Sequence, residues 1–183
     1  MNFRRYLHLC AIKGFDEYRF INWRISINSS RSFTYSINAY EVLKSQMNSA
    51  EKPYEKQIKK DIRRTFTDQK FFESEENIEK LNELLIVFSL HNLDIGYCQG
   101  MNYLAGFLLM QTNGNVHQSF WVLDCIMKEY DQKWLFVRGL PHLNMLLWSL
   151  EHLVDMYLPN LADFIRMENI PTSLYATVGS CVV

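Results

Sequence analysis

Apolar side chains recur at helical spacing along most of this chain, and no stretch alternates as a half-buried β-strand does. Residues 101–110 are apolar nearly all round, so we expect them to form the central helix of the protein. Residues 76–93 carry a single apolar stripe, which predicts an amphipathic helix. That stripe consists of Ile78, Leu81, Leu85 and Phe88.

The proline positions refine this picture near the end of the chain. Pro141 suits the start of a long helix, and the apolar spacing that follows stops near Pro159. Similar spacing predicts further helices in residues 14–27, 33–47, 120–127 and 161–167. The pattern therefore indicates an all-α protein.

Composition narrows the class of protein. The chain has 183 residues, of which 48% are hydrophobic and 14% aromatic, enough for one domain with a sizeable core. A disordered tail is excluded as the main interpretation, because such segments lack apolar and aromatic residues. The net charge of −1 provides no global field for nucleic acid or for a membrane surface.

An uncharged stretch could indicate a membrane span, and the cysteines could indicate a metal site, but the sequence supports neither. Residues 95–123 lack charged side chains, but polar residues interrupt them, and the longest apolar piece, residues 103–110, is far shorter than the ~20 residues of a membrane span. We therefore expect no transmembrane segment. The four cysteines are scattered without C-x-x-C spacing, which predicts neither a zinc site nor a disulfide framework and favours a reducing compartment such as the cytoplasm.

A joint between two helices lies in residues 91–107. The amphipathic helix ends there, the chain breaks at Gly96, and an apolar helix follows. Tyr97, Cys98 and Gln99 stand at the break, with Gly100 behind them. A glutamine just ahead of a buried helix suggests that its amide is needed at the surface, and Gly100 would allow a partner's backbone to approach closely. An ordinary turn between helices explains the same spacing.

The most charged stretch, residues 51–80, has two interpretations. Pro53 suits the start of a helix, and we expect that helix to carry Ile58, Asp61 and Arg64. Their intervals of three spread them over about a third of its circumference. One interpretation is a solvated helix face with an Asp–Arg pair. The other is phosphate binding, because arginine offers a planar fork of donors that matches phosphate oxygens.

Familiar catalytic patterns are missing. The chain has no phosphate-binding glycine loop and no H-E-x-x-H motif, and its histidines do not pair at ligand spacing. Ser89, His91 and Asp94 are too close along one helix to form a catalytic triad. Cys98 has no base near it in sequence, and a small buried thiol is the better interpretation.

Three short motifs occur in a fixed order. An R-x-x-x-W element is followed by I-x-x-D-x-x-R and then by I-G-Y-x-Q-G. They contain Arg19, Trp23, Ile58, Asp61, Arg64, Tyr97, Gln99 and Gly100. In this order and spacing they strongly resemble the TBC domain, the module of GTPase-activating proteins that act on Rab-family small GTPases.

The resemblance implies a function in vesicle trafficking. Arg64 and Gln99 would match the family's catalytic arginine and glutamine, inserted in trans into the nucleotide site of a Rab-family GTPase. Asp61 would orient the arginine and Tyr97 would support the glutamine turn, whereas Arg19 and Trp23 would be supporting structure. The protein would have no cofactor of its own, because GTP and Mg²⁺ are bound to the partner. It would be cytoplasmic, with peripheral association with endomembranes through that partner.

The resemblance covers residues 14–176, and residues 177–183 diverge from it. The chain is therefore expected to be a single partial TBC-like domain over residues 1–183 that lacks the family's second helical subdomain. In that case, apolar surface on residues 143–156 should remain open to solvent. Two alternatives are a non-catalytic GTPase-binding fragment and an unrelated helical scaffold that binds nucleic acid. Acidic residues beside the basic helix and the neutral total charge disfavour the scaffold.

Overall fold

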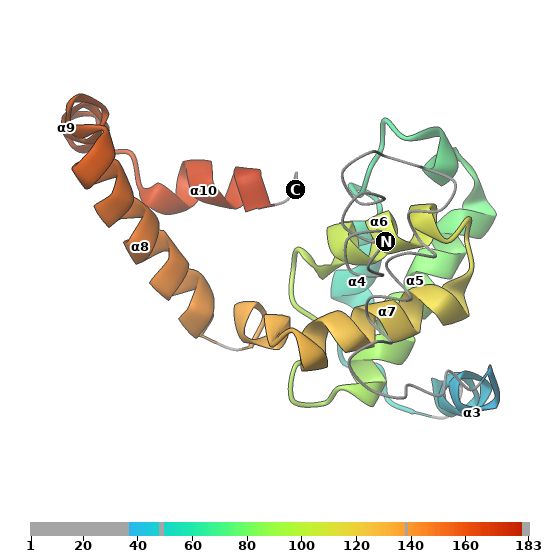
Figure 1. Cartoon of the computed structure of the whole chain (residues 1–183). Coiled ribbons are helices and arrows are strands. Elements are labelled where there is room, and N and C mark those ends of the chain that lie inside the picture. Colours follow the sequence, from blue (N-terminus) through green and yellow to red (C-terminus); the bar gives the residue numbers. More distant parts are fainter. Residues whose placement is uncertain (1–36, 48–49, 138, 181–183) are drawn as a thin grey trace, which may run out of the picture. The chain divides into compact units, whose positions relative to one another are not determined.

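The described residues are helical. The computed structural model describes residues 37–47, 50–137 and 139–180, and within these ranges it contains α-helices and short 3₁₀ helices but no β-strand (Figure 1). The predicted all-α class is confirmed. Contacts divide the chain into two compact units, the first ending at Tyr130 and the second beginning at Asp131. The interpretation of the whole chain as one domain stays a prediction, and the helix predicted in residues 14–27 lies outside the described residues.

The first unit is built around one long helix. Its elements are α3 (Ile37–Met47), α4 (Glu55–Ile62), η1 (Lys70–Glu73), α5 (Glu75–His91), α6 (Met101–Gln111) and α7 (Val116–Glu129). Helix α5 packs against each of the other five. Every residue from 84 to 89 is buried, so neighbours surround this part of the helix on all sides.

The central position of residues 101–110 needs a correction. Helix α6 is largely buried, as expected, but it contacts α4, α5 and α7, whereas α5 has the wider set of neighbours. The stripe predicted on α5 also holds only in part. Leu81, Leu85 and Phe88 are buried, but Ile78, near the start of the helix, is 36% exposed. Both differences depend on which elements pack against a helix. The spacing of apolar residues within that helix does not specify these neighbours.

Aromatic rings hold α3 against the rest of the first unit. The rings of Tyr40 and Phe120 lie 5.2 Å apart, and Phe88 packs against Phe120 at 6.3 Å between centroids. The Tyr40 hydroxyl donates to a carboxylate oxygen of Glu83 at 2.8 Å, which supplies the partner that a buried hydroxyl needs. Burial, followed by this hydrogen bond, raises the pKa of Tyr40. These contacts fix α3 on α5 and α7.

The second unit consists of η2 (Gln132–Leu135), α8 (Pro141–Tyr157), α9 (Pro159–Met167) and α10 (Thr172–Ser180). Helices α8 and α9 begin with proline at the first turn, where its missing N–H costs no hydrogen bond. Helix α8 packs against the other three elements, yet none of its residues is buried. None of the described helices combines the length and the apolar character that crossing a bilayer requires.

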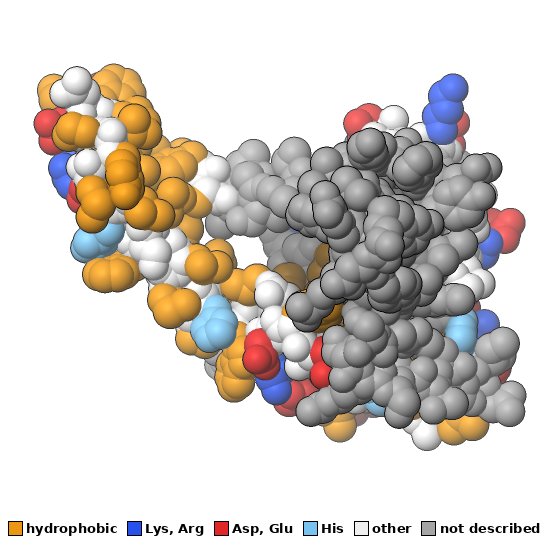
Figure 2. All heavy atoms as spheres, viewed as in Figure 1, with side chains coloured by type: hydrophobic (Ala, Val, Ile, Leu, Met, Phe, Trp, Pro, Cys, Tyr) orange, Lys and Arg blue, Asp and Glu red, His pale blue; other side chains and the backbone are white. Residues whose placement is uncertain are grey.

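Apolar side chains are exposed along the second unit. Figure 2 shows them as orange spheres over α8 and α9, and those on α8 include Met145, Leu146, Trp148, Leu153 and Met156, all more than half exposed. The prediction of open apolar surface on residues 143–156 is confirmed.

Candidate functional site

Arg64 lies just beyond the end of α4. The helix ends at Ile62, and the Arg64 N–H donates to the Asp61 carbonyl oxygen at 3.1 Å. The Thr65 hydroxyl donates to the same oxygen at 2.8 Å, while the Thr65 N–H donates to the Ile62 carbonyl oxygen at 3.0 Å. A hydroxyl that captures a backbone carbonyl in this way competes with continuation of the helix. The prediction that Arg64 belongs to the helix itself is therefore wrong.

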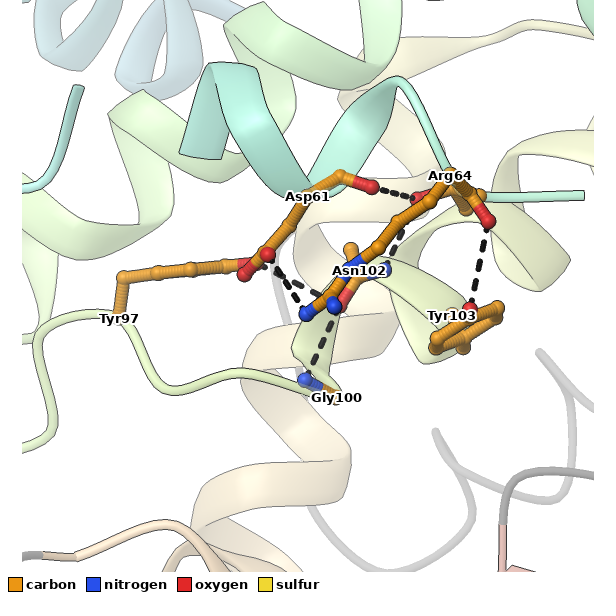
Figure 3. A network of polar contacts seen from close by, with 7 residues as sticks. Asp61, Arg64, Tyr97, Gly100, Asn102 and Tyr103 are labelled. Carbon is orange, nitrogen blue, oxygen red and sulfur yellow. Dashed lines mark hydrogen bonds and ion pairs between the residues drawn. The ribbon is translucent and has the colours of Figure 1, made fainter. Parts of the chain in front are cut away.

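Asp61 is the buried centre of the site. Its side chain accepts two interactions, one from Arg64 Nη2 to Oδ1 and one from the Tyr97 hydroxyl to Oδ2, each at 2.8 Å (Figure 3). A buried carboxylate is tolerated when a cation and hydrogen bonds compensate for lost hydration. Arg64 itself remains 46% exposed at its side chain, so its guanidinium is paired with Asp61 but still reaches solvent.

Tyr97 is buried at 5% exposure, and burial together with the hydrogen bond to Asp61 raises its pKa. Its hydroxyl therefore stays protonated at neutral pH and acts as the donor to Asp61. Two positions later, Gln99 is exposed. The turn thus directs its tyrosine into the protein and its glutamine outward, as the two predicted roles require.

A close backbone approach shapes the start of this turn. Helix α5 ends at His91, and the Asn92 carbonyl oxygen accepts the N–H groups of Ile95 and Gly96 at 3.1 and 2.7 Å. Gly96 has a φ of 63°, and a Cβ added there would lie 2.4 Å from the Tyr54 hydroxyl oxygen. Glycine is needed here both for the left-handed backbone and for the space that Tyr54 occupies.

Asn102 joins the glutamine turn to the arginine turn. It lies in the first turn of α6, two residues after Gly100, and its exposure is 0%. Gly100 has a φ of 104°. Its Oδ1 accepts the Gly100 N–H at 3.0 Å, and its Nδ2 donates to the Thr65 hydroxyl at 2.8 Å. Sequence reasoning assigned Asn102 no role. The signal available was an amide side chain at the start of an otherwise apolar helix.

The predicted site residues can now be placed. Asp61, Arg64, Tyr97 and Gly100 belong to one network of contacts, which passes through Asn102 (Figure 3). Gln99, between Tyr97 and Gly100 in the sequence, is exposed. Ile58 is fully buried and supports α4 by packing. Arg19 and Trp23 lie outside the described residues. The arrangement offers one guanidinium and one primary amide at the surface, a pair that can contact phosphate oxygens and a water molecule.

Two neighbouring features do not extend the chemistry of the site. Burial raises the pKa of the Cys98 thiol, and a protonated thiol is a weak nucleophile. Among the residues that the structure describes, no group of three or more His, Cys, Asp or Glu side chains is placed to hold a metal ion.

A second buried carboxylate, Asp124, lies beside the C-terminal end of α5. Asp124 of α7 accepts from Lys128 Nζ at 2.8 Å and from the Asn92 side chain at 3.1 Å, and His91 Nε2 lies 3.7 Å away. Burial and the nearby Lys128 lower the pKa of His91 and outweigh the opposite effect of Asp124. This cluster joins the end of α5 to α7 and is separate from the network around Asp61.

Comparison with known proteins identifies similar chains. The family model of the Rab-GTPase-TBC domain matches residues 16–179. The GTPase-activating protein GYP5 of Saccharomyces cerevisiae is 32% identical over 161 residues, covering 88% of this chain and 17% of that protein. The human ecotropic viral integration site 5 protein homolog is 30% identical, with coverage of 88% and 19%. This chain therefore spans less than a fifth of either relative.

Solved structures agree on the fold. The flagellar RabGAP TBC domain of Chlamydomonas matches with a TM-score of 0.78 and 21% identity, covering 96% of this chain and 58% of that one. The Ypt/Rab-GAP domain of Gyp1p matches with a TM-score of 0.75 and 16% identity, and the match covers 94% and 65%.

Proposed function

Because the chain belongs to the Rab-GTPase-TBC domain family, we propose that it activates a Rab-family small GTPase by placing Arg64 and Gln99 in the partner's nucleotide site. One observation carries the proposal. Both side chains are exposed, and the two turns that bear them are joined by a buried network through Asp61. The chain would supply residues to the reaction of its partner and would not hydrolyse GTP by itself.

Arg64 would stabilise charge that develops during hydrolysis. Phosphoryl transfer spreads negative charge over the γ-phosphoryl oxygens, so catalysis is mainly positioning and electrostatic stabilisation. An inserted arginine is worth about 10³–10⁵ in rate in GTPase systems. Asp61 binds one guanidinium nitrogen, Nη2, and holds the exposed side chain in place. We expect the other nitrogens to be available to phosphate oxygens.

Gln99 would position the attacking water. Its amide can accept a hydrogen bond from water through its oxygen and donate one to a phosphate oxygen through its nitrogen. GTP and Mg²⁺ would arrive bound to the partner. The place of action that follows from this proposal is the cytoplasmic face of the endomembranes to which that partner is attached.

The arginine role is tested by single-turnover GTP hydrolysis with a panel of Rab proteins. We expect Arg64→Lys to lose most of the stimulation although the charge is kept, because an ammonium cannot reproduce the planar guanidinium fork. Arg63→Lys is the matched control, since Arg63 is the exposed neighbour of Arg64 and should retain the parent rate. If Arg64→Lys stimulates as well as the parent, Arg64 has only a structural role.

The glutamine role is tested by binding. Catalytic groups should interact more strongly with the transition state than with bound GTP. The chain should therefore bind a Rab loaded with GDP and a planar γ-phosphate mimic more tightly than a Rab loaded with a GTP analogue. Gln99→Ala should remove most of this preference, whereas Gln57→Ala, at an exposed position on α4, should keep it. Equal affinity for both nucleotide states would instead indicate docking without activation.

A further inference from the structure

Asn102 has a side-chain orientation that its neighbours determine completely. The Gly100 N–H can only donate, so the atom facing it at 3.0 Å must be the amide oxygen. The Thr65 hydroxyl gives its proton to the Asp61 carbonyl oxygen, so it must accept from the amide nitrogen of Asn102 at 2.8 Å. Reversing the amide would place two donors together at Gly100, which the buried site could not compensate.

The result is a directional chain of hydrogen bonds between two backbone segments. It begins at the peptide group that links Gln99 to Gly100, passes through Asn102 and Thr65, and ends at the Asp61 carbonyl oxygen. That same oxygen accepts the N–H of Arg64. Figure 3 shows Asn102 between Gly100 and the turn that carries Arg64.

This chain differs from the link through the Asp61 carboxylate. Tyr97, Asp61 and Arg64 are joined through their side chains and involve the charge of the arginine. The Asn102 chain is neutral and does not include the guanidinium. The two links approach each other at the Tyr97 hydroxyl, which donates to Asp61 at 2.8 Å and lies 3.4 Å from Asn102 Oδ1. It connects the backbone on the C-terminal side of Gln99 to the backbone on the N-terminal side of Arg64. Loss of Asn102 should therefore shift the glutamine turn while Arg64 keeps its ion pair.

We propose that Asn102 is a positioning residue that sets the place of Gln99 relative to Arg64. The inference rests on the proposed function, since it assigns how that site is held in register. Gly100 has a left-handed backbone with a φ of 104°, and the hydrogen bond from its N–H to Asn102 holds the peptide that follows Gln99. Misplacement of a catalytic group by ~1 Å can cost ~10²-fold in rate.

Single-turnover hydrolysis with a responsive Rab tests this role through double variants. Asn102→Leu keeps the side-chain shape and removes the hydrogen bonds to Gly100 and Thr65 together with the longer contact, 3.4 Å, from the Tyr97 hydroxyl. We expect a loss of about 10²-fold in the maximal rate with little change in the concentration for half-saturation. On an Arg64→Ala background the same substitution should still lower the rate. On a Gln99→Ala background it should cause almost no further loss, because the group that it positions is already absent.

A second variant and a second measurement guard against simple misfolding. Thr65→Val breaks the same chain without touching Asn102 and should reproduce the effect, whereas Thr65→Ser keeps the hydroxyl and should retain most of the rate. Amide hydrogen exchange at Gly100 should accelerate in Asn102→Leu while amides in the core of α5 stay protected. This second measurement needs no GTPase.

The outcomes separate the two proposals. If the parent chain stimulates no Rab, the proposed function fails, and the catalytic part of this inference fails with it. If the parent stimulates and Asn102→Leu costs as much on the Gln99→Ala background as on the parent, the positioning role alone is overturned. Unchanged hydrogen exchange at Gly100 in Asn102→Leu would also overturn it.

Discussion

Two tyrosines of the site allow a controlled measurement of what the buried network contributes to stability. Tyr97 donates to the Asp61 carboxylate at 2.8 Å from a buried position. Tyr103 donates to the Arg64 carbonyl oxygen at 3.3 Å from an exposed hydroxyl. Replacing each with phenylalanine removes one hydroxyl from the same site, and the main differences are the burial, length and charge of the interaction lost. The Tyr97 hydroxyl also has a longer contact, 3.4 Å, with Asn102 Oδ1.

The expected difference follows from those two features. A hydrogen bond to a charged group contributes about 1.5–3 kcal/mol, and its loss from Tyr97 would leave one carboxylate oxygen of Asp61 without its hydroxyl donor. A long, exposed bond between neutral groups is replaced by water, so Tyr103→Phe should change the free energy of unfolding by less than about 0.5 kcal/mol.

Native-state hydrogen exchange is the appropriate assay, because contacts divide the chain into two units and a single melting curve could not assign a loss of stability to one of them. Slowly exchanging amides in residues 84–88 of α5 report opening of the first unit. Since 1.4 kcal/mol corresponds to about a factor of ten, Tyr97→Phe should accelerate their exchange roughly 10- to 100-fold, and Tyr103→Phe by no more than about 2-fold. Equal acceleration in the two variants would refute the importance of the buried carboxylate.

Three further perturbations test other parts of the first unit. Gly96→Ala should destabilise it by about 1–3 kcal/mol, measured by native-state hydrogen exchange in α5, from the left-handed backbone and the contact with Tyr54. Asn115 accepts the Gln118 N–H at the start of α7, and Asn115→Ala should cost about 1 kcal/mol in the same assay. The pKa of His91 is lower in the folded than in the unfolded state, so the unfolded chain binds its proton more readily. Stability should therefore fall as the pH drops below ~6.5, and His91→Gln should make this fall shallower between pH 7.5 and 5.

Each of these has a distinguishing control. Adding Tyr54→Ala to Gly96→Ala should recover the part of the loss due to the contact and leave the backbone part. Asn115→Asp should retain most of the capping effect, because a carboxylate also accepts at a helix N-terminus. An unchanged slope of stability against pH in His91→Gln would show that other groups, and not this imidazole, dominate the acid response.

Much of the fold could be predicted from the sequence because proline and apolar spacing act locally. Pro141 starts α8 as expected, and α8 ends just before Pro159. The following helix was predicted from residue 161, yet α9 begins at Pro159 itself. Proline is tolerated in the first turn of a helix, so the residue that stops one helix can open the next.

The sequence indicated several residues that the structure brings together, but not how they are connected. Motif order indicated Asp61, Arg64, Tyr97 and Gln99, through resemblance to a family. The end of α4 before Arg64 depends on the Thr65 hydroxyl, whose competition with the helix is not visible in residue spacing. The partners of Asn102 depend on which turns meet in space, and a single sequence does not contain that information.

The buried network is better explained by register than by stability. Removing Asp61 from water costs several kcal/mol, and well-packed apolar residues often replace buried ion pairs at no loss. The hydrogen bond that Tyr97 donates to Asp61 and the one that Asn102 accepts from the Gly100 N–H have fixed directions, whereas apolar contacts can slide and repack. If Arg64 and Gln99 must reach one phosphate group together, the turns that carry them need a fixed relative position to within about 0.5 Å. A polar network that crosses between those turns meets this requirement. Thr65→Val perturbs its neutral link, and Tyr97→Phe removes the hydroxyl that donates to the Asp61 carboxylate.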